Sequence, residues 1–302
     1  MHLFMTGGTG FIGSAVIPEL LGAGHRVTAL ARSSEAAAKL EAMGATALPG
    51  SLDDLAAIER GARDSDGVIH LGFDHDFANM GRVSAMDTRA IEAMIDALAG
   101  SDRPLLVAAG LAGFTLDRPI AESDAPTIPE ASFPRLTSGR VTLEAAQRGV
   151  RSMIVRFAPT VHGAGDRAFI PQLIRIARER GLAAYIDDGA NRWAAVHRLD
   201  AARVVRLGIE LASAGSVLHA VGEEGITTRA IAESFGAHLG VPVRSIAREQ
   251  AHEHFGFLGM FFGANLAASN ESTRSMLDWT PMHAGLLEDL ADAPYFAPVG
   301  SR

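Results

Sequence analysis

Short apolar runs alternate with longer stretches of helical periodicity through the first half of the chain. Residues 2–6 read HLFMT, which is typical of a buried strand, and residues 11–24 carry apolar positions at helical spacing before Gly22 and Gly24. The same alternation continues to about residue 160. It predicts strands at 2–6, 26–31, 46–50, 67–72, 104–110 and 151–159, and helices at 11–24, 33–44, 52–61, 80–99 and 134–149.

Strands that are apolar almost throughout, and that are separated by helices, indicate a parallel sheet covered on both faces. Because crossovers between parallel strands are right-handed, we predict an α/β fold of the Rossmann type, a doubly wound parallel sheet. Later elements are shorter: an amphipathic helix at 169–181 precedes a strand and helix at 193–212, with Asp200 as the predicted N-cap. We expect a dinucleotide-binding domain at 1–165, to which 190–220 returns, and a smaller C-terminal substrate lobe formed by 166–189 and 221–302.

The composition argues against several classes of protein. The 302 residues carry a formal net charge of −8 and no basic run, which disfavours nucleic acid and anionic membrane surfaces as partners. Without cysteine there are no disulfides, thiolate nucleophiles or cysteine-held zinc, and we expect no metal site. The first strand begins directly after Met1, and no apolar run approaches the ~20 residues of a membrane span. We therefore expect a cytoplasmic monomer or homodimer that acts on a small molecule.

The sequence TGGTGFIG (6–13) follows the first predicted strand and opens the first predicted helix. Gly7 permits a tight turn, Gly10 lets the backbone approach a pyrophosphate, and Gly13 lets the helix pack closely on the strand. The helix N-terminus then offers free N–H groups and a partial positive charge to the phosphates. This arrangement predicts a dinucleotide cofactor.

The end of the second predicted strand bears on the choice of nicotinamide cofactor. Proteins that prefer NAD usually place a carboxylate about 20 residues past the glycines, where it binds the ribose 2′-hydroxyl. Here the strand ends ALARSS, and Arg32 and Ser33 stand at that position. A guanidinium pairs well with a 2′-phosphate, so we predict NADP. Glu35 lies close enough to keep NAD as the alternative.

The spacing Thr-Gly-x-x-Gly-x-x-Gly resembles that of the extended and atypical short-chain dehydrogenases/reductases, and four later motifs match that superfamily in order. They are VIHLG (68–72), RFAPTVHGAGD (156–166), WAAVHRLDAA (193–202) and LDWTP (277–281). His162 stands where the second motif usually has tyrosine. The resemblance covers almost the whole chain and implies further cofactor contacts from Thr9, Phe11, Ile12, Leu52, Leu71, Gly72 and Pro159.

Typical members of that superfamily reduce or oxidise a carbonyl with serine, tyrosine and lysine. The Tyr-x-x-x-Lys spacing places the last two on one helix face, one turn apart. Here residues 136–144 read LTSGRVTLE, with Leu136 and Arg140 at those positions, and Ala108 and Ala109 stand where the serine or threonine is usual. The resemblance is therefore to the subgroup that keeps the glycine motif without the usual active-site residues.

Residue counts support this assignment. Lys39 is the only lysine of the chain, and it lies in the helix after the second strand, on the adenosine side. Tyr185 and Tyr295 are the only tyrosines, and neither is followed by lysine four residues later. No rearrangement of this chain supplies the pair at helical spacing.

Three residues are candidates for the missing roles. His75, in GFDHDF (72–77), follows the fourth strand at the edge where such sheets bind ligands, and it can act as an acid near neutral pH; otherwise it caps the next helix. Ser138, with Thr137 beside it, can bind a substrate oxygen or relay a proton, unless these hydroxyls cap a helix. Arg140 can hold the ribose hydroxyls, or it can pair with Glu144 at i,i+4.

These observations favour an NADP(H)-dependent oxidoreductase that acts on a small organic carbonyl-type substrate, with His75, a hydroxyl or water handling the proton. The aromatic stretch HFGFLGMFFGA (254–264) can line an apolar pocket or belong to the core. Two alternatives stay open: a non-catalytic NADP(H)-binding sensor, and an epimerase, dehydratase or lyase that uses a bound cofactor.

Overall fold

The computed structural model describes residues 1–76, 79–291 and 295–296. Its centre is a seven-stranded sheet in the order β10-β6-β5-β4-β1-β2-β3, and every pair of neighbours is parallel. This order confirms the predicted doubly wound sheet, because the chain starts in the middle, runs to one edge and returns to the other side of its first strand. The strands are β1 (His2–Thr6), β2 (Arg26–Ala31), β3 (Thr46–Pro49), β4 (Gly67–His70), β5 (Pro104–Gly110), β6 (Arg151–Phe157) and β10 (Ser216–Ala220).

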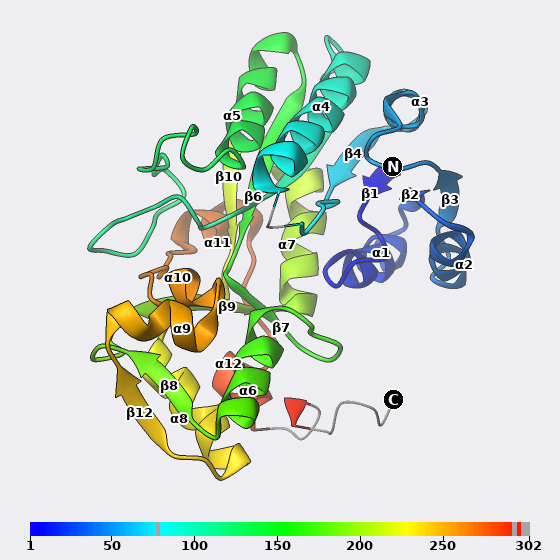
Figure 1. Ribbon diagram of the computed structural model, residues 1–302. Coiled ribbons are helices and arrows are strands. Elements are labelled where there is room, and N and C mark those ends of the chain that lie inside the picture. Colours follow the sequence, from blue (N-terminus) through cyan, green and yellow to red (C-terminus); the bar gives the residue numbers. More distant parts are fainter. Residues whose placement is uncertain (77–78, 292–294, 297–302) are drawn as a thin grey trace.

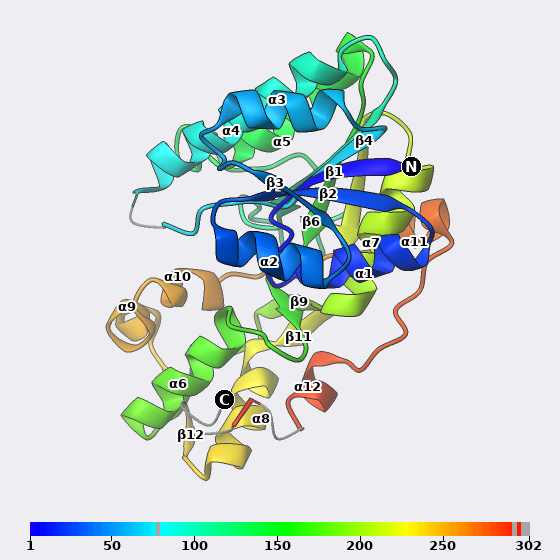
Figure 2. The same cartoon turned by 90° about the vertical axis from the view of Figure 1, so that its right-hand side faces the viewer.

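Helices cover both faces of this sheet (Figure 2). One layer contains α1 (Gly13–Gly22), α2 (Ser34–Ala42) and α7 (Arg198–Leu211); the other contains α3 (Leu55–Arg63), α4 (Met80–Leu98) and α5 (Leu136–Glu144), which continues as the 3-10 helix η2 (Ala145–Arg148). Apolar side chains of the strands are buried on both sides: Met5 and Leu106 face the first layer, and Phe4 and Leu105 face the second. The alternation in the sequence therefore reflects a sheet without a solvent face.

The smaller lobe continues from the end of β6 and lies beyond that end of the sheet (Figure 1). A three-stranded sheet in the order β11-β9-β7 and a two-stranded sheet of β12 and β8 form its frame. Its strands are β7 (Thr160–His162), β8 (Ala183–Ile186), β9 (Arg192–His197), β11 (Glu223–Thr227) and β12 (Val243–Ile246). Its helices are α6 (Phe169–Arg180), α8 (Thr228–Leu239), η3 (Arg248–Gln250), α9 (Ala251–Phe255), α10 (Leu258–Phe262) and α12 (Leu286–Asp289), while α11 (Glu271–Leu277) packs beside β10 and α7.

The prediction of Asp200 as the N-cap of α7 is wrong. The N-cap is His197, three residues earlier, and its ring accepts a hydrogen bond from the N–H of Leu199. Asp200 is instead buried in the first turn and accepts hydrogen bonds from the backbone N–H groups of Met282 and His283. The carboxylate that the local sequence assigns to the helix end therefore binds a distant segment of the chain.

No helix within the described ranges combines the length and the apolar character that crossing a membrane requires.

The turn between β1 and α1 depends on its glycines. Gly7 has φ of +72°, and a Cβ there would lie 2.6 Å from the backbone nitrogen of Gly72 at the end of β4. A Cβ at Gly13 would lie 2.1 Å from the carbonyl oxygen of Gly7. Neither approach is possible for a larger residue, so the glycines fix how closely α1 begins over β1 and β4.

The variant Gly13→Ala tests this close approach. We expect it to lower the free energy of unfolding by about 1–3 kcal/mol, because the added methyl overlaps a backbone oxygen that packing holds in place. Gly22→Ala, at the other end of the same helix, is the matched control, since a Cβ there meets nothing within 4 Å. Alanine should stabilise that position by about 0.5–1 kcal/mol. Urea denaturation measures both changes, and equal effects would contradict this account of the turn.

Candidate active site

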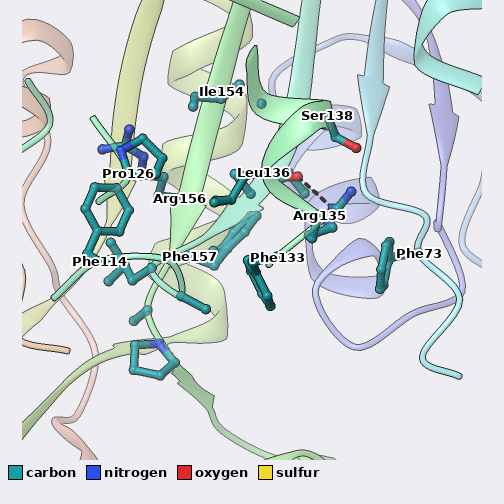
Figure 3. Close-up of a pocket in the computed structure, with 18 of the residues that line it drawn as sticks. Phe73, Phe114, Pro126, Phe133, Arg135, Leu136, Ser138, Ile154, Arg156 and Phe157 are labelled. Atoms are coloured by element: carbon teal, nitrogen blue, oxygen red, sulfur yellow. Dashed lines mark hydrogen bonds between the residues drawn. The ribbon is translucent and has the colours of Figure 1, made fainter. Parts of the chain in front are cut away.

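A cavity of about 1120 Å³ lies where the glycine turn, the ends of β5 and β6, and the smaller lobe meet. Gly7, Gly10 and Gly13 form part of its wall, together with Phe11 and Ile12. Most of the remaining wall is apolar, and much of it is aromatic. The aromatic residues are Phe73, Phe114, Phe133, Phe157, Phe169, Phe257 and Phe261, and Figure 3 shows four of them around the interior.

The structure places the candidate cofactor residues in two groups. The first group lines the cavity and contains Gly7, Gly10, Phe11, Ile12, Gly13, Leu71, Arg140 and Pro159. The second group is not part of the wall: Thr9, Arg32 and Ser33 are exposed, Leu52 is half-buried, and Gly72 is buried. The Ser33 hydroxyl accepts the N–H of Ala36 and so caps α2.

A buried chain of hydrogen bonds begins beside the glycine turn. The N–H of Gly72 donates to the Thr6 hydroxyl at 3.0 Å, and that hydroxyl lies 2.7 Å from Nδ1 of His70. Nε2 of His70 lies 3.1 Å from a carboxylate oxygen of Asp87 on α4. The Nε2–H group of His70 donates to the Asp87 carboxylate, which can only accept. The ends of β1 and β4 are thereby tied to the middle of α4.

Asp87 is the buried centre of a wider cluster. Its second carboxylate oxygen accepts hydrogen bonds from the Ser138 hydroxyl at 2.6 Å and from Arg135. Burial by itself would raise the pKa of this carboxyl. Hydrogen bonding and charge from His70, the charge of Arg135 and the Ser138 hydroxyl outweigh burial and hold the pKa below its ordinary value. Asp87 is therefore a carboxylate at neutral pH, although it has no exposed surface.

Arg135 is the cation of this cluster and part of the cavity wall. Besides Asp87, its guanidinium donates to the carbonyl oxygen of Ala108 at 3.0 Å, at the carboxyl end of β5. Its central carbon lies 4.1 Å from the centre of the Phe73 ring, a cation–π contact. The side chain is only 16% exposed. Three contacts from three different elements thus fix this charge, and Figure 3 shows it facing Phe73 across the cavity's edge.

Two of the three predicted catalytic residues lie on α5. Ser138 is buried, and its hydroxyl donates to Asp87. Arg140 is bonded to Glu130 at 2.8 Å and to Glu144 at 2.9 Å, so the expected i,i+4 pair exists. The Arg140 guanidinium also lowers the pKa of Glu130.

The third, His75, is exposed on the cavity wall, with its ring edge-on to Phe73 at 5.7 Å between centres. The neighbouring carboxylates Asp74 and Asp76 both pair with Arg82 on α4. The N-cap position of α4 belongs to Asn79, so His75 does not cap that helix. Phe77, the last residue of the quoted motif, lies outside the described residues.

The lysine and the two tyrosines lie away from the cavity. Lys39 is bonded to Glu35 on the surface of α2, Tyr185 belongs to β8, and the Tyr295 hydroxyl accepts the N–H of Gly163. None of the three is among the described residues that line the cavity.

Sequence reasoning missed Arg135 and Asp87, and only one of them left a signal. Asp87 interrupts the apolar face of α4, on which Val83, Met94 and Ile91 are buried. A lone carboxylate in such a stripe needs a buried partner, which is a recognisable pattern. Arg135 sits in a loop-to-helix segment without periodicity, and only the fold brings it to Asp87.

The fold and this site define a dinucleotide-binding α/β protein. The chain belongs to the NAD dependent epimerase/dehydratase family, whose model matches residues 3–220. An uncharacterized protein of Schizosaccharomyces pombe is 44% identical, over 98% of this chain and 100% of its own length.

Two further similarities differ in kind. A ketoreductase of Stigmatella aurantiaca that acts on 4-hydroxy-2-methyl-3-oxo-4-farnesyl-3,4-dihydroquinoline-1-oxide, as its name states, is 28% identical over 72% of this chain and 67% of its own. The dTDP-glucose 4,6-dehydratase DesIV of Streptomyces venezuelae, solved with NAD bound, superimposes with a TM-score of 0.77 over 96% of both chains. At 19% identity, the second similarity shows the fold alone.

Removing the buried carboxylate should be costly. We expect Asp87→Asn to lower the free energy of unfolding by about 3–5 kcal/mol at neutral pH, because it leaves the Arg135 charge buried without a counter-ion. Asp96→Asn is the matched control on the same helix, since Asp96 pairs with Arg148 at the surface. That change should cost less than about 1 kcal/mol.

The cost of Asp87→Asn should also depend on pH. The folded-state pKa of Asp87 lies below the ordinary value of 3.8, so the carboxylate stabilises the fold above that value. Its contribution is lost as the pH falls through the folded-state pKa. Denaturation at neutral and at acidic pH measures this, and a difference between wild type and variant that persists unchanged into strong acid contradicts the assignment.

Proposed function

We propose that this protein is an NADP(H)-dependent oxidoreductase that reduces the carbonyl group of a small, largely apolar organic compound. One observation carries the proposal: the glycine turn and a mostly apolar, aromatic wall belong to the same cavity of about 1120 Å³. A cofactor held at the turn would therefore share this space with an apolar substrate.

The turn fits the phosphates of a dinucleotide. Phe11 and Ile12 lead directly into Gly13, the first residue of α1, and all three line the cavity. Their backbone N–H groups make no hydrogen bond with any described part of the chain. Three consecutive open donors at a helix N-terminus, with glycines beside them, form an anion-binding surface.

The end of β2 supports NADP over NAD. Arg32 and Ser33 are exposed there, while Glu35, the nearby carboxylate, is bonded to Lys39 at 2.7 Å. A guanidinium and a capping hydroxyl suit a 2′-phosphate.

The variant Arg32→Gln tests the choice of cofactor. It should weaken NADPH binding by about tenfold or more, because a charge-assisted hydrogen bond to phosphate is lost, and it should leave NADH binding nearly unchanged. Arg26→Gln, at the opposite end of the same strand, is the control. Titration by calorimetry gives both dissociation constants, and a wild-type preference for NADH would overturn the prediction.

The residues of the cavity then have the following proposed roles. When bound, the reduced cofactor supplies the hydride that converts the carbonyl to an alcohol, and one proton completes the reduction. We assign that proton to His75, which is exposed on the cavity wall and whose imidazole can serve as a general acid. Arg140, held by Glu130 and Glu144, stays the candidate contact for the ribose. Ser138 acts through Asp87, to which its hydroxyl is bonded.

Two of the similarities bear on this choice. The Stigmatella relative is a ketoreductase by name, and its named substrate carries a long apolar farnesyl group. The wall of this cavity has the same apolar character. The likeness to sugar-nucleotide enzymes is confined to the fold, and we therefore favour ketone reduction over epimerisation or dehydration.

The decisive assay follows NADPH consumption with a panel of apolar ketones, enones and imines, for example 2-acetonaphthone. We expect turnover with at least one apolar ketone, and no reaction with dTDP-glucose. Tight NADPH binding without any turnover would point to the sensor instead, and conversion of dTDP-glucose would point to a dehydratase.

The role of His75 is tested in the same assay. His75→Gln should lower kcat by about a hundredfold or more without changing NADPH affinity, because a general acid is lost. The control is His252→Gln, on the exposed side of α9. Full activity of the His75 variant would show that His75 is not the proton donor and would leave water in that role.

A further inference from the structure

Arg135 brings a largely buried positive charge to the apolar wall of the cavity. The residue stands immediately before α5, and its guanidinium reaches the carboxyl end of β5. Phe73, Phe133 and Leu136 line the cavity around it (Figure 3). A ligand held here would have apolar groups beside the charge on several sides.

The guanidinium is not saturated by the protein. Arginine has five N–H donors. Two of them are used within the described structure, one by Asp87 and one by the carbonyl oxygen of Ala108. The Phe73 ring covers one face of the group at 4.1 Å, which leaves the other donors in the plane of the guanidinium. The remaining donors have no partner among the described residues, so an acceptor from a ligand would complete this site.

The other two arginines of the wall are more fully engaged. Arg156 contacts the carbonyl oxygens of Glu122 and Asp124 and the ring of His219, and it lies over Phe114. Arg140 uses three of its nitrogens on two glutamates. Arg135 therefore offers the most open donors of the three.

The position of this charge is fixed before any ligand binds. Asp87, which anchors Arg135, is itself held by His70 and by Ser138. Asp87, His70 and Ser138 are all buried. A donor set that is held rigidly, in surroundings with little water, stabilises negative charge on a reacting oxygen without reorganisation. The guanidinium does not release its proton, so this effect is electrostatic and separate from proton donation.

We propose that Arg135 binds the carbonyl oxygen of an apolar ketone and stabilises the negative charge that develops on this oxygen during reduction. This inference rests on the proposed reductase function. It adds two things to that function. The first is the residue that contacts the reacting oxygen, and the second is the substrate class, a ketone with apolar groups on both sides of its carbonyl.

A binding experiment tests the site without turnover. The probes are 2-naphthoate, an apolar carboxylate, and 2-naphthamide, which has the same shape without the charge. With NADP⁺ present at saturation, the wild type should bind the carboxylate more tightly. Arg135→Met should weaken naphthoate binding by about tenfold or more and leave naphthamide binding nearly unchanged, because only the charged contact is lost. Arg148→Met is the matched control, an exposed arginine on the same helical segment.

A kinetic experiment tests the role in reduction. With a ketone that the wild type reduces, Arg135→Met should lower kcat/KM by about 10²–10³ at unchanged NADPH affinity. Arg135→Lys should retain more activity than the methionine variant, since it keeps the charge. Circular dichroism checks folding, and the double variant Asp87→Asn/Arg135→Met, which removes both buried charges, supplies a second test should the single variant unfold.

The outcomes separate this inference from the proposed function. If the wild-type protein reduces no ketone, the reductase function is contradicted. If Arg135→Met nevertheless loses the selectivity for naphthoate that the wild type shows, the oxygen-binding site is supported. A wild type that reduces ketones while Arg135→Met does so equally well contradicts the role of Arg135. Equal affinity of the wild type for naphthoate and naphthamide also overturns it.

Discussion

The buried carboxylate of Asp87 holds together the elements that form the site. It connects the end of β4 through His70, the start of α5 through Arg135 and Ser138, and the end of β1 through the Thr6 hydroxyl. Because Thr6 immediately precedes the first glycine of the turn, the glycine turn and the Arg135 side of the cavity share one network. Such a network is stable only when every member has a hydrogen-bond partner. A substitution at one end should therefore change the stability of the hydrogen bonds at the other end.

The distribution of polarity in the cavity gives the clearest indication of substrate. Aromatic and aliphatic side chains make up most of the wall, and its three arginines are held by protein partners. A sugar nucleotide presents hydroxyl groups and phosphates that need many donors, whereas a ketone with apolar substituents needs one or two. The smaller lobe adds to the apolar surface at the cavity: Phe257 is 44% exposed and Met260 is 71% exposed, and both line it. Apolar side chains exposed beside a cavity are suited to a partly apolar ligand.

Positions 135–140 contain two arginines whose surroundings differ. Leu136 and Arg140 stand where the resembling superfamily has tyrosine and lysine. Arg140 is neutralised by two glutamates, while Arg135, which no motif marks, holds a largely buried charge beside the apolar wall. The proposal moves the electrostatic part of the reaction to Arg135 and proton donation to His75, two residues that both contact the Phe73 ring.

The sequence by itself determined the layered α/β fold, the glycine turn and the family. Apolar periodicity depends on local geometry, so strands such as 26–31 and 104–110 were predicted at their observed bounds, and the spacing of Gly7, Gly10 and Gly13 follows from the turn alone. The ends of helices differ from the prediction: α1 is shorter than predicted, and the stretch at 134–149 divides into α5 and η2. Only the tertiary structure decided which charges meet. Arg135 and Asp87 are 48 residues apart, and Asp200 pairs with a segment 82 residues away. Pairing over such distances depends on how helices pack across the sheet, and no local pattern records that.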